Sequence, residues 1–171
     1  MSRLQAPQES KLSPELQAKY EAATKPATGL PSTFQFLFAN PQIGSGLAGL
    51  HEAAANAGLE PWVTLTVALT VAHERDNQAL WASFEPLARE AGVSDVVIAG
   101  IAAGTAPRGL LPKEGIWVHF TKELLQDKMR DSTWQSTTHL VGDEGAVALA
   151  VTAYYYDMMA RLNRTLDLDT A

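Results

Sequence analysis

The sequence contains no cysteine among its 171 residues. This absence excludes disulfide bonds, thiolate metal sites and thiol redox catalysis on this chain. Basic residues are also scarce, since 13 Lys and Arg stand against 19 Asp and Glu, which gives a net charge of -6. A protein that neutralises nucleic-acid phosphates needs an excess of Lys and Arg, so we expect no nucleic-acid partner. The same charge gives no reason to expect attraction to anionic lipid.

Long apolar runs are absent as well. No run reaches the length of a membrane span, so we expect no membrane association. The opening stretch MSRLQAPQES lacks the apolar core of a secretory signal peptide, and we therefore expect a cytoplasmic protein. The 4 histidines show neither His-x-x-x-His nor His-Glu-x-x-His spacing, and no carboxylate cluster joins them, so no metal site is predicted.

What is present indicates one all-α domain. Ser13-Pro14-Glu15 combines an N-cap, a first-turn proline and an early acid, which predicts a helix to about Ala23. A second helix follows the break at Asn40-Pro41, and its apolar residues recur three or four positions apart, as a buried stripe requires. These residues are Ile43, Leu47, Leu50 and Ala54. The predicted organisation is a flexible arm at 1–12, a single domain at 13–165 and a frayed tail at 166–171.

The segment PWVTLTVALTVA, residues 61–72, is ambiguous. Its valines and leucines alternate with threonines and alanines, which is the period of a half-buried strand. Both neighbouring segments are helical, however, and a lone strand would leave its backbone groups without partners. We therefore predict that residues 62–72 form a buried helix.

Further helices are predicted from residue 73 onward. The stretch HERDNQALWASFEPLAREAGVSD, residues 73–95, predicts one amphipathic helix that ends at Gly92, and another helix that begins at Ser94. After a break at Gly142, the last helix is predicted from about Asp143 to Leu162. Apolar and aromatic residues gather on one side of it. They are Val147, Ala150, Val151, Tyr154 and Met158.

Three stretches, taken in order and spacing, resemble the carboxymuconolactone decarboxylase superfamily, which includes the alkylhydroperoxidase D-like proteins. They are SPELQAKYEAA with GLPSTFQFLFANPQI, then LWASFEPLAREAGVSDVVIAGI, then LVGDEGAVALAVTAYYYDMMARLN. The resemblance covers nearly the whole chain. It implies a compact antiparallel helical bundle of the alkylhydroperoxidase D-like type, and a homo-oligomer that is a trimer or a hexamer.

The departures from that family bear on activity. Its redox branch carries Cys-x-x-Cys-x-x-x-His, with a glutamate twelve residues before the first cysteine. By the resemblance, the cysteine positions are Asn77 and Leu80 here, the histidine position is Phe84 and the glutamate position is Leu65. A peroxidase needs a thiolate and a base to form it, so thiol peroxidase activity is excluded. The decarboxylase branch generally keeps the glutamate and the histidine, so any activity must use other residues.

His73 and Asn77 are the predicted catalytic residues. On one helix, a spacing of four residues would put both side chains on the same face. His73 would then move protons near neutral pH, and Asn77 would donate to a developing oxyanion. The alternative is that His73 merely ends a helix and faces solvent. His51 and His119, on apolar helices, are read as interior histidines or as subunit-contact residues.

The predicted substrate-binding residues are mostly apolar. Trp81 and Phe84 form either an aromatic pocket wall or part of a core, and the resemblance adds Leu80 and Leu65 to that wall. Tyr154 is the candidate among three consecutive tyrosines, whose side chains point in different directions around a helix. Arg108, in the loop APRGLLP, either holds a substrate carboxylate or is an ordinary surface charge.

Two functions remain open at this point. The first is an enzyme that acts on a small carboxylated or cyclic metabolite by acid–base chemistry without a cofactor, as a decarboxylase-like lyase or an isomerase. The second is a non-catalytic relative that kept the oligomeric bundle and a ligand pocket after losing the family site.

Overall fold

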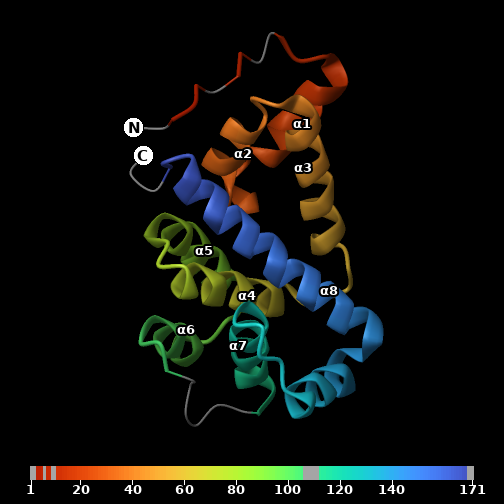
Figure 1. Ribbon diagram of the computed structural model, residues 1–171, viewed down its shortest axis with the longest axis vertical. Coiled ribbons are helices and arrows are strands. Elements are labelled where there is room, and N and C mark those ends of the chain that lie inside the picture. The colour runs from red at the N-terminus through yellow and green to blue at the C-terminus, as the bar shows by residue number, and fades with distance from the viewer. Residues whose placement is uncertain (1–2, 6, 9–10, 106–111, 169–171) are drawn as a thin grey trace.

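The computed structural model describes residues 3–5, 7–8, 11–105 and 112–168. Within these ranges the chain is helical and contains no strand (Figure 1). The first elements are α1 (Pro14–Ala23), the 3-10 turn η2 (Pro26–Thr28), α2 (Pro31–Leu37) and α3 (Pro41–Ala55). They are followed by α4 (Pro61–Glu74), α5 (Gln78–Glu90), α6 (Asp95–Ala102), α7 (Pro112–Leu125) and α8 (Asp131–Thr165). The all-α prediction is confirmed.

Helix α4 is the central element and packs against α5, α7 and α8. Val67 and Leu69 are fully buried on it. The hydroxyls of Thr66 and Thr70 are buried too, and they donate to the carbonyls of Trp62 and Thr66 at 2.7 and 2.8 Å. The polar half of the alternating pattern is thus satisfied within the helix. A helix surrounded on all sides has no polar face, so its helical period is hidden, and the predicted buried helix is confirmed.

Helices α1, α2 and α3 pack together, and α2 and α3 also contact α8. Phe38 is fully buried, and Tyr20 meets it edge to face with ring centroids 5.3 Å apart. The close approach of α3 occurs at Gly44, where a Cβ would lie 2.7 Å from the Phe38 ring. The predicted buried stripe of α3 is therefore wrong at Ile43, which is 54% exposed, because the helix presents a small residue to the core instead.

Helix α8 is long and bends at Gly142, whose backbone angles are φ 70° and ψ 178°. The predicted break at this glycine is confirmed. Beyond it, α8 runs diagonally across the molecule (Figure 1), with Leu149 and Met159 fully buried on its inner side. On the side where the sequence gathers apolar and aromatic residues, Val147, Val151 and Tyr154 are exposed.

The two ends of the described chain meet beside the C-terminal end of α8. The amide of Arg3 donates to the carbonyl of Leu166 at 3.0 Å, and Leu168 is buried. Figure 1 accordingly shows both termini on one side of the molecule. Over the described ranges, none of the helices combines the length and the apolar character needed to cross a membrane.

Candidate functional site

The turn at residues 75–77 separates α4 from α5, so the predicted single helix through His73 and Asn77 is wrong. Asp76 adopts the left-handed conformation with φ 49°. The amides of Asp76 and Asn77 donate to the carbonyls of His73 and Ala72, each at 2.9 Å. This pair of bonds is a Schellman motif, which closes a helix. His73 therefore lies in the last turn of α4, and Asn77 is the N-cap of the next helix.

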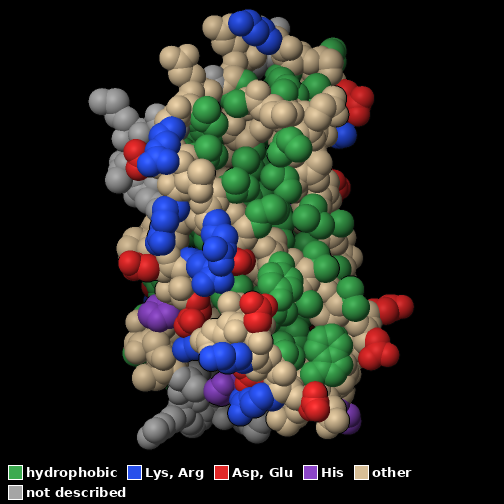
Figure 2. Space-filling model, viewed as in Figure 1, with side chains coloured by type: hydrophobic (Ala, Val, Ile, Leu, Met, Phe, Trp, Pro, Cys, Tyr) green, Lys and Arg blue, Asp and Glu red, His purple; other side chains and the backbone are tan. Residues whose placement is uncertain are grey.

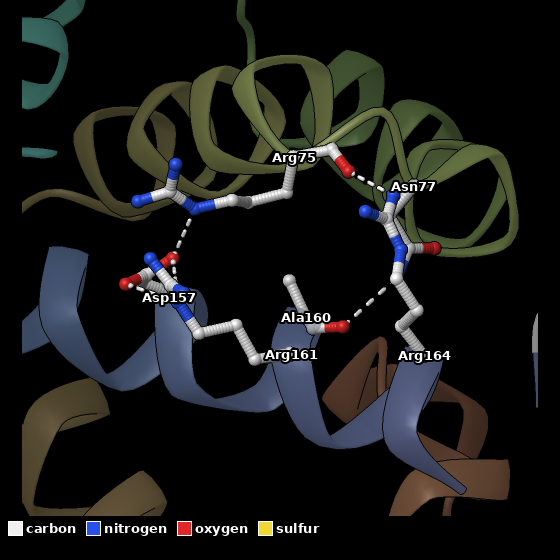
Figure 3. A network of polar contacts seen from close by, with 6 residues as sticks. All are labelled: Arg75, Asn77, Asp157, Ala160, Arg161 and Arg164. Carbon is white, nitrogen blue, oxygen red and sulfur yellow. Dashed lines mark hydrogen bonds and ion pairs between the residues drawn. The ribbon is translucent and has the colours of Figure 1, made fainter. Parts of the chain in front are cut away.

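Asn77 is a structural cap in this position. Its side chain is buried, and its Oδ1 accepts the amide of Leu80 at 3.0 Å, which caps α5. Its Nδ2 donates to the carbonyl of Ala160 in α8 at 3.4 Å (Figure 3). Both ends of the amide are thus engaged inside the protein. Because the Asn77 side chain is buried, a substrate oxyanion could reach its Nδ2 only if the packing between α5 and α8 opened.

The same turn is held to α8 by charged side chains (Figure 3). Arg75 forms an ion pair with Asp157, which also accepts from Arg161 at 3.1 Å. Arg164 donates to the carbonyl of Arg75 and to that of Asp76, the latter at 3.2 Å. These contacts satisfy the last carbonyls of the α4 terminus. The segment predicted to be catalytic is therefore a structural connection between α4 and α5.

His73 lies apart from Asn77. The His73 side chain is half-buried, and a Cβ at Gly104, just beyond α6, would lie 3.3 Å from its Nε2. The Asn77 side chain is directed to α8 through its bond to Ala160. The structure does not bring the two predicted catalytic side chains onto one face.

Apolar side chains fill the positions that the resemblance equates with the second cysteine and the histidine. Leu80 is 3% exposed and Phe84 is 1% exposed. Phe84 meets Tyr156 edge to face with centroids 5.1 Å apart. It also lies under Gly29, where a Cβ would be 2.3 Å from its ring and where φ is +71°. A glycine is required there for both reasons, and the Phe84 ring is enclosed by its neighbours.

The other predicted binding residues are dispersed. Trp81 is half-buried, and its indole N–H donates to Glu85 on the same helix at 3.0 Å. Tyr154 is 51% exposed on the outer side of α8. Arg108 lies outside the described residues. Leu65 lines a cavity at the N-terminal end of α4, whereas the turn follows the C-terminal end of that helix.

That cavity and a neighbouring one meet at His51. The first, about 390 Å³, is bounded by α3, α4, α5 and α8, and its wall includes Leu65, Glu90 and Tyr156. The second, about 440 Å³, lies between α1 and α3. Thr28, His51 and Ala55 line both. Each volume lies within the range that small organic ligands occupy in proteins.

His51 combines partial burial with an unused imidazole. Its ring contacts Phe34 and Tyr155, with centroids 5.9 and 5.7 Å away. Within the part of the chain that the structure describes, neither ring nitrogen of His51 has a hydrogen-bond partner. Burial lowers the pKa of His51 below its ordinary value of 6.5. The imidazole is therefore neutral at pH 7, with one nitrogen able to accept a proton.

Two tyrosines lie next to this histidine. Burial, together with the neighbouring phenol of Tyr156, raises the pKa of Tyr155, and burial alone raises the pKa of Tyr156. Both phenols therefore stay protonated and act as hydrogen-bond donors rather than bases. The Tyr155 hydroxyl is buried without a partner among the described residues. The cavity wall thus offers one base, His51, and one neutral donor, Tyr156, while Tyr155 contacts the His51 ring without lining the cavity.

Sequence reasoning assigned no site to His51. One signal was available in the stretch LAGLHEAAA, where small residues surround the histidine on its helix. Small side chains leave space beside a helix, and an imidazole facing such space stays accessible. Which helices close around that space depends on the tertiary packing, which the pattern of one helix does not contain.

No three His, Asp or Glu side chains converge as a possible metal site anywhere in the described ranges. No family model matches this chain, and neither a curated protein nor a solved structure matches it significantly. The resemblance to the carboxymuconolactone decarboxylase superfamily thus depends on the residue order and spacing of the chain itself.

Proposed function

We propose that this chain is a carboxymuconolactone decarboxylase-like protein that binds a small cyclic or carboxylated metabolite beside His51 and exchanges protons with it, without a cofactor. One observation carries the proposal. A neutral, partly exposed imidazole lines two adjoining cavities and has no hydrogen-bond partner within the described residues. The proton-handling role therefore moves from His73 and Asn77 to His51.

The chemistry follows from the donors and acceptors around the cavity. The neutral His51 accepts a proton from the carbon next to a substrate carbonyl, and the resulting imidazolium returns a proton to the product. The Tyr156 hydroxyl is the donor that would stabilise the oxygen on which negative charge develops. The apolar part of the cavity wall is formed by Leu59, Leu65 and Leu87. Such a wall excludes water and strengthens these hydrogen bonds.

A carboxylate on the ligand has a partner in the second cavity. Lys19 lines that cavity and pairs with Glu15 at 3.3 Å across an exposed surface. An exposed ion pair of this kind contributes little, so its lysine is available to a ligand anion. A ligand that spans both cavities would place its ring beside Tyr156 and its carboxylate near Lys19.

The resemblance supplies the wider setting of this proposal. It implies an alkylhydroperoxidase D-like bundle, assembly into a trimer or hexamer, and a lyase or isomerase reaction. The all-helical fold and the cysteine-free composition are consistent with a branch that no longer uses sulfur.

A second candidate is a non-catalytic relative that binds a ligand or only assembles. The burial of Leu80 and Phe84 favours it, because these two side chains close the face on which the family carries its reactive groups. The two candidates agree on the fold and differ on whether His51 transfers protons.

Proton exchange measured in D₂O separates them. We would incubate the full chain with a stable cyclic keto acid such as 3-oxocyclopentanecarboxylate, and follow by NMR the loss of signal from the protons beside the ketone carbonyl. The enzyme proposal predicts exchange above the buffer rate in the wild type. It predicts a loss of at least about tenfold in His51→Gln and none in the exposed-site control His139→Gln.

Chemical-shift changes in the same samples report binding. Shifts at residues around His51 without exchange in any variant would support the non-catalytic candidate. Equal exchange in wild type and His51→Gln would remove His51 from the mechanism. Neither binding nor exchange across a panel of such acids would refute the proposed site.

A further inference from the structure

The outer side of α8 carries an apolar stripe that no part of the described chain covers. Val147, Val151 and Tyr154 are 60%, 42% and 51% exposed, and Met158 is partly buried beside them. Their spacing of four, three and four residues puts them on one face, with the seven-residue repeat of a helix that packs against another helix. Figure 2 shows a hydrophobic band along this face, which continues over α3. Large exposed apolar faces of this kind mark interaction sites.

Opposite charges end the stripe. Glu144, exposed, lies three residues before Val147. Arg161, with a side chain 64% exposed, lies three residues after Met158. Figure 2 shows the same asymmetry, since Lys and Arg side chains gather around the C-terminal half of α8 and acidic side chains project beside its bend.

The stripe of one copy is complementary to the stripe of a second copy that runs in the opposite direction. If two copies of α8 lie antiparallel, with a two-fold axis level with the peptide bond between residues 152 and 153, each exposed position meets its counterpart. Glu144 then faces Arg161 of the second copy, Val147 faces Met158, and Val151 faces Tyr154. A two-fold interface requires this kind of self-complementarity. A parallel pair would instead set Glu144 against Glu144.

We propose that this face is the interface with a second copy of this chain, paired antiparallel along α8 in the register just described. A stable interface buries on the order of 1,600 Å² in total, which is more than one helix stripe supplies. The continuation of the hydrophobic band over α3 provides the remaining surface. The charged ends select the antiparallel direction, and the apolar centre supplies most of the affinity.

Sedimentation of the purified full chain tests the interface. Val151→Glu places a charge opposite Tyr154 twice at each two-fold interface, so the dissociation constant of that interface should rise by at least about a hundredfold. Val96→Glu is the matched control, because Val96 is 57% exposed on α6 and should leave the assembly unchanged. Circular dichroism of both variants checks that the helices remain folded.

A charge reversal tests the register itself. Glu144→Arg sets two arginines against each other at each end and should weaken the assembly by about tenfold. Adding Arg161→Glu in the same chain restores the opposite charges and should return the constant to near the wild-type value. The chain has no cysteine. Introduced cysteines are therefore the only thiols. Because position 151 faces position 154 of the second copy, the double variant Val151→Cys, Tyr154→Cys should form intermolecular disulfides on mild oxidation, whereas Val96→Cys should not.

Each result decides the proposal. Loss of assembly in Val151→Glu, rescue by the reversed pair and cross-linking at 151 and 154 support it. A wild-type chain that stays monomeric at submillimolar concentration overturns it. An oligomer that Val151→Glu leaves intact, or a reversed pair that fails to rescue, also overturns it.

Discussion

The α4–α5 turn and the wall around His51 use their polar groups in opposite ways. In the turn, the Asn77 amide and the Arg75 guanidinium are both bound to α8, and the free helix-end carbonyls accept from Arg164. In the wall, the His51 imidazole has no such partner within the described residues, and neither has the buried hydroxyl of Tyr155, whose ring contacts His51. A satisfied buried polar group supports the fold, and an unsatisfied one costs stability, whereas the partly exposed imidazole remains available to a ligand.

The contrast reverses the expectation drawn from the sequence. The stretch from His73 to Asn77, which was predicted to hold the catalytic residues, connects α4 to α5. His51, to which the sequence assigned no site and which has Ala48, Ala54 and Ala55 one turn away, is the histidine that lines two cavities. Substitutions in the two regions should therefore have different kinds of effect, and the following predictions are ordered from the largest effect to the smallest.

Phe84→Ala should destabilise the protein by about 4 kcal/mol, because it removes a fully buried ring and leaves a cavity between Gly29 and Tyr156. Urea unfolding followed by circular dichroism measures the change. Val96→Ala, at a 57% exposed position, is the control and should stay within about 0.5 kcal/mol of wild type. A cost for Phe84→Ala below about 1 kcal/mol would show that α5 is not held by this packing.

Asn77→Ala should cost about 2 kcal/mol, since it removes the cap of α5 and leaves the buried carbonyl of Ala160 without its donor. Tyr155→Phe is the matched comparison from the other region. It removes a buried hydroxyl that has no partner among the described residues, so it should cost nothing measurable. The same urea measurement serves both variants. Equal costs in the two would contradict the division between a satisfied and an unsatisfied region.

Much of the helical architecture could be predicted because its signals are local. Ser13 accepts the Leu16 amide at 3.4 Å as the expected N-cap of α1, and Gly142 bends α8 where a break was predicted. Residues 62–72 required their neighbours to be interpreted, because a helix buried on all sides has no polar face to reveal its period. Local chemistry and helical period therefore suffice for the number and the type of elements.

The turn at residues 75–77 could not be predicted in the same way. Its left-handed residue is Asp76 rather than a glycine, and no proline marks the boundary. Charged side chains of α8 hold the turn, and these residues lie about 80 positions further along the chain. The exposure of one face of α8 could not be predicted either, since an apolar stripe has the same sequence pattern whether the core or a second copy covers it.

The smallest effect is the pH dependence that His51 confers on stability. The pKa of His51 in the folded protein lies below 6.5, its ordinary value in an unfolded chain. At pH values between these two pKa values, the unfolded chain therefore binds more protons than the folded protein. Stability from this residue is therefore complete above about pH 6.5 and declines as the pH falls through that window. His51→Gln, which does not titrate, should show a smaller drop in urea midpoint between pH 7.5 and pH 5.5 (roughly one unit on either side of an ordinary histidine pKa).

An NMR titration measures the same quantity at the residue itself. The imidazole signal that disappears in His51→Gln identifies His51, and its midpoint in the wild type should lie below 6.5. A ligand anion in either cavity would favour the imidazolium and raise that midpoint, whereas an uncharged ring would exclude water and lower it further. The direction of the shift on adding a cyclic carboxylate therefore reports how the ligand lies. A midpoint at or above 6.5 in the free protein would mean that His51 faces water, and the wall would lose the neutral base on which its chemistry depends.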